Sequence, residues 1–129
     1  MLTGMTIESI GLHDISISPI STVSSAIRKM RAEGLASLPV IEKGRLVGVV
    51  YLLDINNARG SDGIRPLIRT GSTYLRLKNT ADEAWEVMVR NKGTWVPVVE
   101  NGKYLGVVTL DSILECYKGK IALLRNIKN

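Results

Sequence analysis

The side chains best suited to chemistry stand where two apolar runs end. Asp54 follows the run LVGVV, and Thr109 and Ser112 follow the run LGVV. A carboxylate accepts hydrogen bonds from both hydroxyls of a sugar diol, and a neighbouring hydroxyl can donate or accept. A helix is expected to begin at each point, and its free N–H groups favour phosphate. The two junctions are therefore candidate ligand sites, with simple helix capping as the structural alternative.

Catalytic machinery is not expected anywhere in the chain. His13 is the single histidine and stands beside Asp14, where a loop or strand-edge role is expected. No Cys/His cluster has the spacing of metal ligands. Neither G-x-x-x-x-G-K-(S/T) nor G-x-G-x-x-G occurs, so those phosphate-binding loops are absent. We expect no enzyme, no catalytic residue, no metal and no catalytic cofactor.

The residues around each junction occur twice. LPVIEKGRLVGVVYLLDI (38–55) aligns without a gap on VPVVENGKYLGVVTLDSI (96–113), at an offset of 58 residues. Pro39 matches Pro97, and Gly48 matches Gly106. Self-similarity at a fixed period indicates a repeated structural unit. Two equivalent copies of one fold are therefore predicted.

Each copy contains two strands around a tight turn. Asn101-Gly102 is a strong hairpin signal because both residues tolerate positive φ, and the stretch 42–45 serves the first copy less distinctively. The second strands are almost continuously apolar, which predicts burial on both faces. Gly48 and Gly106 lie inside them, where glycine indicates close approach of backbone or ligand, or tight packing alone.

A helix is expected before each hairpin and another after it. Thr22 and Thr80 are placed as N-caps, and Gly34 and Gly93 as the stops. Short extended stretches, 15–17 and 74–77, precede these helices. The helices after the hairpins have Asp54 or the pair 111–112 available as caps. Each copy thus reads strand, helix, strand, strand, helix, an α+β fold.

The two copies resemble a tandem pair of CBS domains, the Bateman module. The resemblance rests on two occurrences of h-P-V-h-(x)n-G-h-h-G-h-h-(T/S)-x-x-(D/N)-h, each after a capped helix, and it covers nearly the whole chain. It implies two β-α-β-β-α repeats related by a pseudo-two-fold axis, with adenosine-containing ligands held in clefts between them. The expected organisation is an N-terminal segment (1–12), repeat 1 (13–58), a basic linker (59–70), repeat 2 (71–116) and a C-terminal helical tail (117–129).

In the family, a Thr or Ser and an Asp three residues later hold the ribose. Here the first copy has Tyr51 where Thr is expected but keeps Asp54, whereas the second keeps Thr109 but has Ser112. Neither copy has the full pair, so we predict weak or single-site nucleotide binding, in the micromolar range or worse. The family's adenine pockets borrow residues from the other copy. By that match, the Thr109 site is completed by Ser21, Ala36 and Ser37. The Asp54 site is completed by Asn79, Thr94 and Trp95.

Composition sets the remaining expectations. The 129 residues carry a formal net charge of +5, and the stretch 59–78 holds five bases against one acid. A basic surface of this kind can be a solvated face, a site for ligand phosphates or a contact for nucleic acid. The one cysteine, Cys116, and the absence of a signal peptide fit a cytoplasmic location. No stretch approaches 18 apolar residues, so no membrane span is expected.

These observations predict a stand-alone regulatory module that forms a homodimer. It is expected to bind AMP, ADP, ATP or S-adenosylmethionine and to signal to an unknown effector protein by conformational linkage. Two alternatives stay open. One is a basic CBS protein associated with nucleic acid, and the other is a dimerisation module without a ligand.

Overall fold

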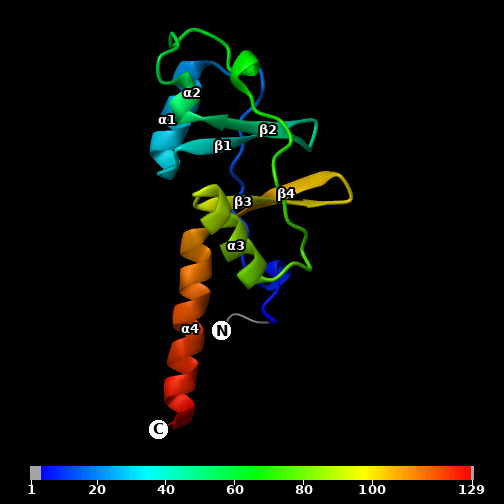
Figure 1. Cartoon of the computed structure of the whole chain (residues 1–129), viewed down its shortest axis with the longest axis vertical. Coiled ribbons are helices and arrows are strands. Elements are labelled where there is room, and N and C mark those ends of the chain that lie inside the picture. Colours follow the sequence, from blue (N-terminus) through cyan, green and yellow to red (C-terminus); the bar gives the residue numbers. More distant parts are fainter. Residues whose placement is uncertain (1–3, 129) are drawn as a thin grey trace. The chain divides into compact units, whose positions relative to one another are not determined.

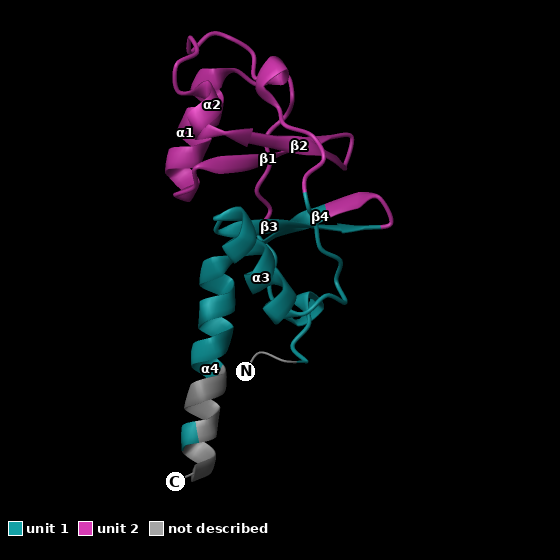
Figure 2. Ribbon diagram, in the orientation of Figure 1, with its two compact units in different colours: residues 1–13, 73–100, 105–129 teal, residues 14–72, 101–104 magenta. Residues whose placement is uncertain are grey.

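The computed structural model describes residues 4–128, and within the last helix it describes side chains through residue 119 and at 125. This part of the chain contains four α-helices and two β-hairpins; Figure 1 labels them. The chain divides into two compact units, coloured separately in Figure 2. Unit 1 comprises Met1–His13, Thr73–Glu100 and Leu105–Asn129, and unit 2 comprises Asp14–Ser72 and Asn101–Tyr104. The segment before each repeat thus belongs to the unit that contains the other repeat.

Unit 2 is built on the first repeat. Its elements are α1 (Val23–Glu33), β1 (Ser37–Glu42), β2 (Arg45–Tyr51), α2 (Leu52–Ile55) and a 3-10 turn at Arg65–Leu67. Thr22 caps α1 by accepting a hydrogen bond from the Ser25 amide, and Gly34 ends the helix in the left-handed conformation, as predicted. β1 and β2 pair antiparallel, with Leu38 opposite Val50. The last three residues before Tyr51 are buried in succession, as expected for a strand covered on both faces.

Unit 1 repeats this plan with α3 (Ala81–Asn91), β3 (Trp95–Glu100), β4 (Lys103–Thr109) and α4 (Leu110–Lys128), preceded by a 3-10 turn at Ile7–Ser9. Thr80 and Glu83 form a capping box at the start of α3. The predicted stop at Gly93 is wrong by one residue, because Lys92 takes the left-handed conformation at the C-cap. The buried core of this unit joins the 3-10 turn at Ile7–Ser9, α3, both strands and α4.

The first strand predicted for each repeat is not a full strand in the structure: it forms a single isolated β-bridge. Ile17 pairs in parallel with Val40, and Leu75 pairs in parallel with Val98, at equivalent positions of the two copies. Both residues are buried, so the extended stretches add to the core without forming longer strands. The mixed α+β class is confirmed.

The predicted C-terminal helix is present and continuous with the helix of repeat 2. Ile113 is buried, and Cys116 and Tyr117 pack partly buried against the unit 1 core. The apolar residues expected further along, Ile121 and Leu124, lie outside the described side chains. Within the described residues, no helix has the length and apolarity needed to cross a membrane.

Candidate ligand-binding junctions

The first junction contains a salt bridge rather than an open carboxylate. Asp54 lies inside the short helix α2 and receives two hydrogen bonds of 2.7 Å from Arg69, from Nε and Nη2. The Arg69 guanidinium also lies over the Tyr51 ring, 5.2 Å from its centroid. The hydrogen bond and the charge of Asp54 raise the pKa of Arg69 above its ordinary value. The predicted ribose-binding carboxylate is therefore held by a base of the same chain.

The close approach of the linker explains how Arg69 reaches Asp54. Arg69 pairs with Val49 through two backbone hydrogen bonds of 2.9 Å. A Cβ added at Gly48 would lie 2.3 Å from the Arg69 carbonyl oxygen and 2.7 Å from Ile68 Cγ2. Of the explanations left open for this glycine, close approach of backbone is thus the one observed.

The second junction has the same layout, with a hydroxyl in place of the carboxylate. Ser112, which is equivalent to Asp54 at the 58-residue offset, lies 3.1 Å from Nε2 of His13. The Thr109 hydroxyl donates to Ser112 Oγ at 3.0 Å and accepts from the Ser112 amide at 3.2 Å. Thr109 therefore caps the start of α4, and the prediction that residues 111–112 supply this cap is wrong. Asp54 likewise provides no cap for α2.

At the second junction too, a glycine leaves space for a second segment to pack against the strand. His13 pairs with Val107 through two backbone hydrogen bonds of 2.9 Å. An added Cβ at Gly106 would lie 2.9 Å from the His13 carbonyl oxygen, and this glycine has a φ of 139°. In both units, then, a segment from outside that unit's own repeat passes the glycine and places a side chain on the junction.

The residues predicted to complete the adenine pockets occupy equivalent positions. The carbonyl oxygens of Ser21 and Asn79 accept from the amides of Ile64 and Ile7, at 3.0 and 2.8 Å. The Asn79 side chain is engaged in its own turn, accepting from the Arg76 amide and donating to Glu83.

The remaining four predicted residues lie at the starts of the repeat hairpins. The carbonyl oxygen of Ala36 accepts from the Leu52 amide at 2.9 Å, and that of Thr94 accepts from the Leu110 amide at 2.8 Å. Ser37 begins β1 and pairs with Tyr51. Trp95 begins β3 and is half-buried. Ala36 and Ser37 thus adjoin the Asp54 junction of unit 2, and Thr94 adjoins the Thr109 junction of unit 1. Their assignment to the junction of the other copy stays a prediction.

Sequence reasoning missed Arg69 and His13 as members of the two junctions. In the sequence, Arg69 is one of the five bases of residues 59–78, and His13 is predicted to lie in a loop or at a strand edge. The available signal was the pair of glycines, which predicted a close neighbour without saying which segment supplies it. Among the described residues, no group of three or more His, Cys, Asp or Glu side chains could hold a metal ion.

The comparisons with known proteins place this architecture in a family. A family model described as the CBS domain matches residues 7–61 and 64–119. The chain therefore belongs to the CBS domain family, as a tandem pair. An inosine-5'-monophosphate dehydrogenase of Korarchaeum cryptofilum is 35% identical over 109 residues, which is 82% of this chain and 23% of that protein. The chain thus spans about a quarter of that relative's length.

Solved structures share the fold at low sequence identity. A CBS domain pair/ACT domain protein from Thermotoga maritima has a TM-score of 0.78 at 18% identity, covering 90% of this chain and 98% of that one. The CBS domain pair of protein MJ0100, solved in complex with 5′-methylthioadenosine and S-adenosyl-L-methionine, has a TM-score of 0.73 at 20% identity, covering 90% and 98%.

Proposed function

We propose that this CBS pair is a regulatory module that binds an adenosine-containing ligand at its strand-to-helix junctions. The observation that carries the proposal is the Asp54 carboxylate in α2, just after β2, which is oriented by a bidentate bond to Arg69. Support also comes from MJ0100, whose CBS pair was solved with two adenosine-containing ligands. AMP, ADP, ATP and S-adenosylmethionine are the ligand class.

At the first junction, the ribose hydroxyls donate to the Asp54 carboxylate. To do so they replace the two hydrogen bonds from Arg69, whose side chain is two-thirds exposed and able to move away. A ligand phosphate offers the displaced guanidinium a new bidentate partner. S-adenosylmethionine offers no phosphate. Phosphorylated ligands therefore have the advantage at this junction.

At the second junction, a ligand meets no carboxylate. Thr109, Ser112 and His13 already hydrogen-bond with one another, and Thr109 also caps α4. A neutral hydrogen bond is weaker than one to a charged acceptor. The first junction is accordingly the tighter site, in keeping with the predicted single-site binding.

The regulatory step follows from what holds the linker. Within unit 2, residue 69 is fixed by its backbone pairing with Val49 and by its side chain on Asp54. A ligand that binds the Asp54 carboxylate breaks its ion pair with Arg69. The linker then populates other conformations, and an effector protein detects this change. By linkage, the effector changes ligand affinity by the same factor.

Isothermal titration of the full chain with AMP, ATP and S-adenosylmethionine tests the proposal. Asp54→Asn keeps the shape of the side chain but removes its charge, and should weaken binding roughly ten- to a hundredfold. Glu86→Gln, a loss of the same charge on the exposed surface of α3, is the matched control and should bind as the unmodified chain does. Absence of binding by all three ligands, or equal affinity of Asp54→Asn, contradicts the proposal.

The two alternatives have outcomes of their own. A mobility shift with DNA or RNA that fades steeply with salt would favour nucleic-acid association. Against it, Arg65 and Arg69 of the linker are paired with Glu42 and Asp54. Sedimentation showing a dimer without any ligand response would favour a dimerisation module. Exposed Trp85 and Val89 on one face of α3 support the predicted homodimer through helices.

A further inference from the structure

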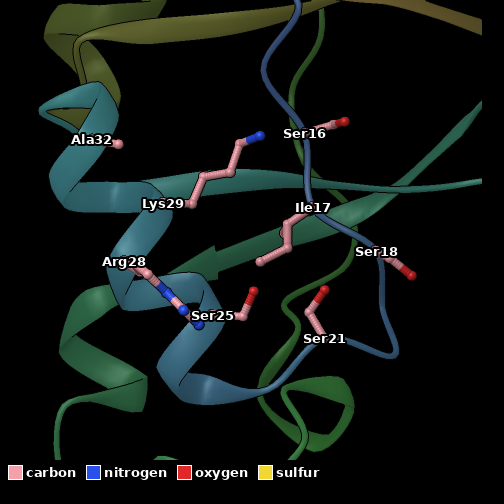
Figure 3. Close-up of a pocket in the computed structure, with 8 residues that line it drawn as sticks. All are labelled: Ser16, Ile17, Ser18, Ser21, Ser25, Arg28, Lys29 and Ala32. Atoms are coloured by element: carbon pink, nitrogen blue, oxygen red, sulfur yellow. The ribbon is translucent and has the colours of Figure 1, made fainter.

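Unit 2 contains a pocket apart from the Asp54 junction. Of the residues predicted to complete the adenine pockets, only Ser21 lines it. It lies between α1 and the extended segment that precedes this helix, and has a volume of about 440 Å³ (Figure 3). Its floor includes the buried Ile17. The α1 residues that line it stand at positions 25, 28, 29 and 32, one face of the helix. The buried α1 residues are Val23, Ala26 and Met30, and none of them lines the pocket.

The lining of the pocket is cationic and rich in hydroxyls. Arg28 and Lys29 contribute two positive charges, and none of the eight lining residues is acidic. In the part of the chain that the structure describes, the ion pairs join other residues, so neither cation is neutralised. Figure 3 shows Arg28 extending alongside Ser25 and Lys29 extending toward the segment at Ser16.

Most of the hydroxyls are also uncommitted. Within the described residues, the side-chain oxygens of Ser16, Ser21 and Ser25 make no hydrogen bond, whereas that of Ser18 accepts from the Ile20 amide at 3.3 Å. Three hydroxyls are thus available to donate beside two cations. Such a group of donors matches the several oxygens of a phosphate, which accept from arginine, lysine and hydroxyl groups together.

The second copy shows that the fold does not require this chemistry. At the 58-residue offset, Ser25 corresponds to Glu83, Arg28 to Glu86 and Lys29 to a valine. The equivalent helix α3 forms with these two acids, and Glu83 completes its capping box. The cationic face of α1 is therefore a property of the first copy alone, where a structural role does not explain it.

We infer that this pocket binds the phosphate group of a small phosphorylated molecule. Its volume is in the range of small-molecule sites and exceeds what a single phosphate needs. Its lining contains no aromatic side chain on which a base could stack, and its apolar residues are Ile17 and Ala32. A phosphate ester of a small polar compound fits these features. The inference does not rest on adenosine binding at the junctions.

Titration calorimetry of the full chain with ribose 5-phosphate and inorganic phosphate tests it, with ribose as the uncharged comparison. We expect saturable binding of both phosphates and none of ribose. The double variant Arg28→Gln/Lys29→Gln should lose at least about tenfold in affinity. Arg31→Gln removes a charge from the same helix outside the pocket and should leave the affinity within about twofold.

A second variant tests the pocket without removing a positive charge, in case the double variant weakens phosphate binding only by lowering the net charge. Ser25→Glu introduces the residue of the second copy, which completes a capping box with Thr22 and should keep or raise the thermal midpoint. It should nevertheless abolish phosphate binding, because a carboxylate then faces the pocket. Failure of ribose 5-phosphate to bind the unmodified chain overturns the inference, as does an equal loss in Arg31→Gln. Adenosine binding through Asp54 is unaffected by either result.

Discussion

The two junctions of this CBS pair share one layout and differ in charge. In unit 2, Arg69 crosses at Gly48 and binds the Asp54 carboxylate. In unit 1, His13 crosses at Gly106 and hydrogen-bonds with the Ser112 hydroxyl. The backbone arrangement is thus the same in both copies, while the side chains differ: a guanidinium–carboxylate ion pair in unit 2 and an imidazole–hydroxyl hydrogen bond in unit 1.

This difference shows which part of the junction the fold requires. Backbone pairing at Val49 and Val107 holds each crossing segment, whatever side chain it carries. The side chains at the junction are then free to diverge, and with them the ability to hold a ligand. A repeated fold can in this way keep its backbone pairing while the chemistry of its two junctions differs.

The largest expected effect comes from adding a side chain at Gly48, where the linker packs against β2. Gly48→Ala places a methyl group against the Arg69 carbonyl, a contact of 2.3 Å that backbone must move to relieve. We expect it to destabilise the protein by about 2–3 kcal/mol, measured by urea denaturation. Gly106→Ala, with a contact of 2.9 Å, should also destabilise. Gly11→Ala, with open space around it, should change stability by less than about 0.5 kcal/mol. Equal stability of Gly48→Ala and Gly11→Ala would show that the crossing is not fixed.

Restoring a carboxylate to the second junction sharpens the comparison. Ser112→Asp gives this copy the Thr and Asp of the family pattern, three residues apart. We expect adenosine-ligand affinity at this junction to rise roughly ten- to a hundredfold, since a charge-assisted bond replaces a neutral one. Calorimetry should then detect two sites rather than one. Leu114→Asp, a new acid two residues further along α4, is a control for charge alone, and an equal gain there would contradict the prediction.

The second copy also differs from the first in its hairpin, where Tyr104 replaces Leu46 at the 58-residue offset. The Tyr104 hydroxyl donates to the Ile15 carbonyl within unit 2. Burial, and secondarily the charge of Asp14, raises the pKa of Tyr104 well above its ordinary range. The folded protein therefore keeps a proton that the unfolded chain loses near pH 10, so the free energy of unfolding falls as pH rises above about 10.

Tyr104→Phe tests this contribution. It should cost about 1 kcal/mol at pH 7 through the lost hydrogen bond, and should reduce the loss of stability above about pH 10. Tyr74→Phe, at a half-exposed tyrosine of unit 1, is the control and should leave the alkaline profile unchanged. Identical profiles for Tyr104→Phe and the unmodified chain would refute the prediction.

The smallest expected effect comes from removing the base that holds Asp54. Arg69→Ala frees the carboxylate, so adenosine and S-adenosylmethionine should bind several-fold more tightly at the first junction. ATP should gain less, because its phosphates lose the guanidinium. The matched change at the second junction, His13→Ala, should alter both affinities little. Measured by competition calorimetry, a uniform loss for all ligands in Arg69→Ala would contradict the idea that Arg69 competes with ribose.

Much of the local structure could be predicted from residue types. Thr22, Thr80 and Gly34 cap helices because their side chains or backbone freedom act over a few residues. Asn101-Gly102 makes its turn with φ values of 52° and 78° for the same reason. Errors of the same short range remained: Lys92 ends α3 one residue before Gly93, Thr109 caps α4 in place of residues 111–112, and α2 has no side-chain cap.

The composition of the junctions depended on contacts distant in sequence. Arg69 lies 15 residues from Asp54, and His13 lies 99 residues from Ser112. No local pattern encodes such a pairing, because it depends on which segment passes the glycine and in which register. The repeat, the helices, the hairpins and the family were determined by the sequence itself, since periodicity and turn chemistry act locally. Only the tertiary structure decided that each junction is engaged by a segment from outside its own repeat, because long-range packing brings those side chains together.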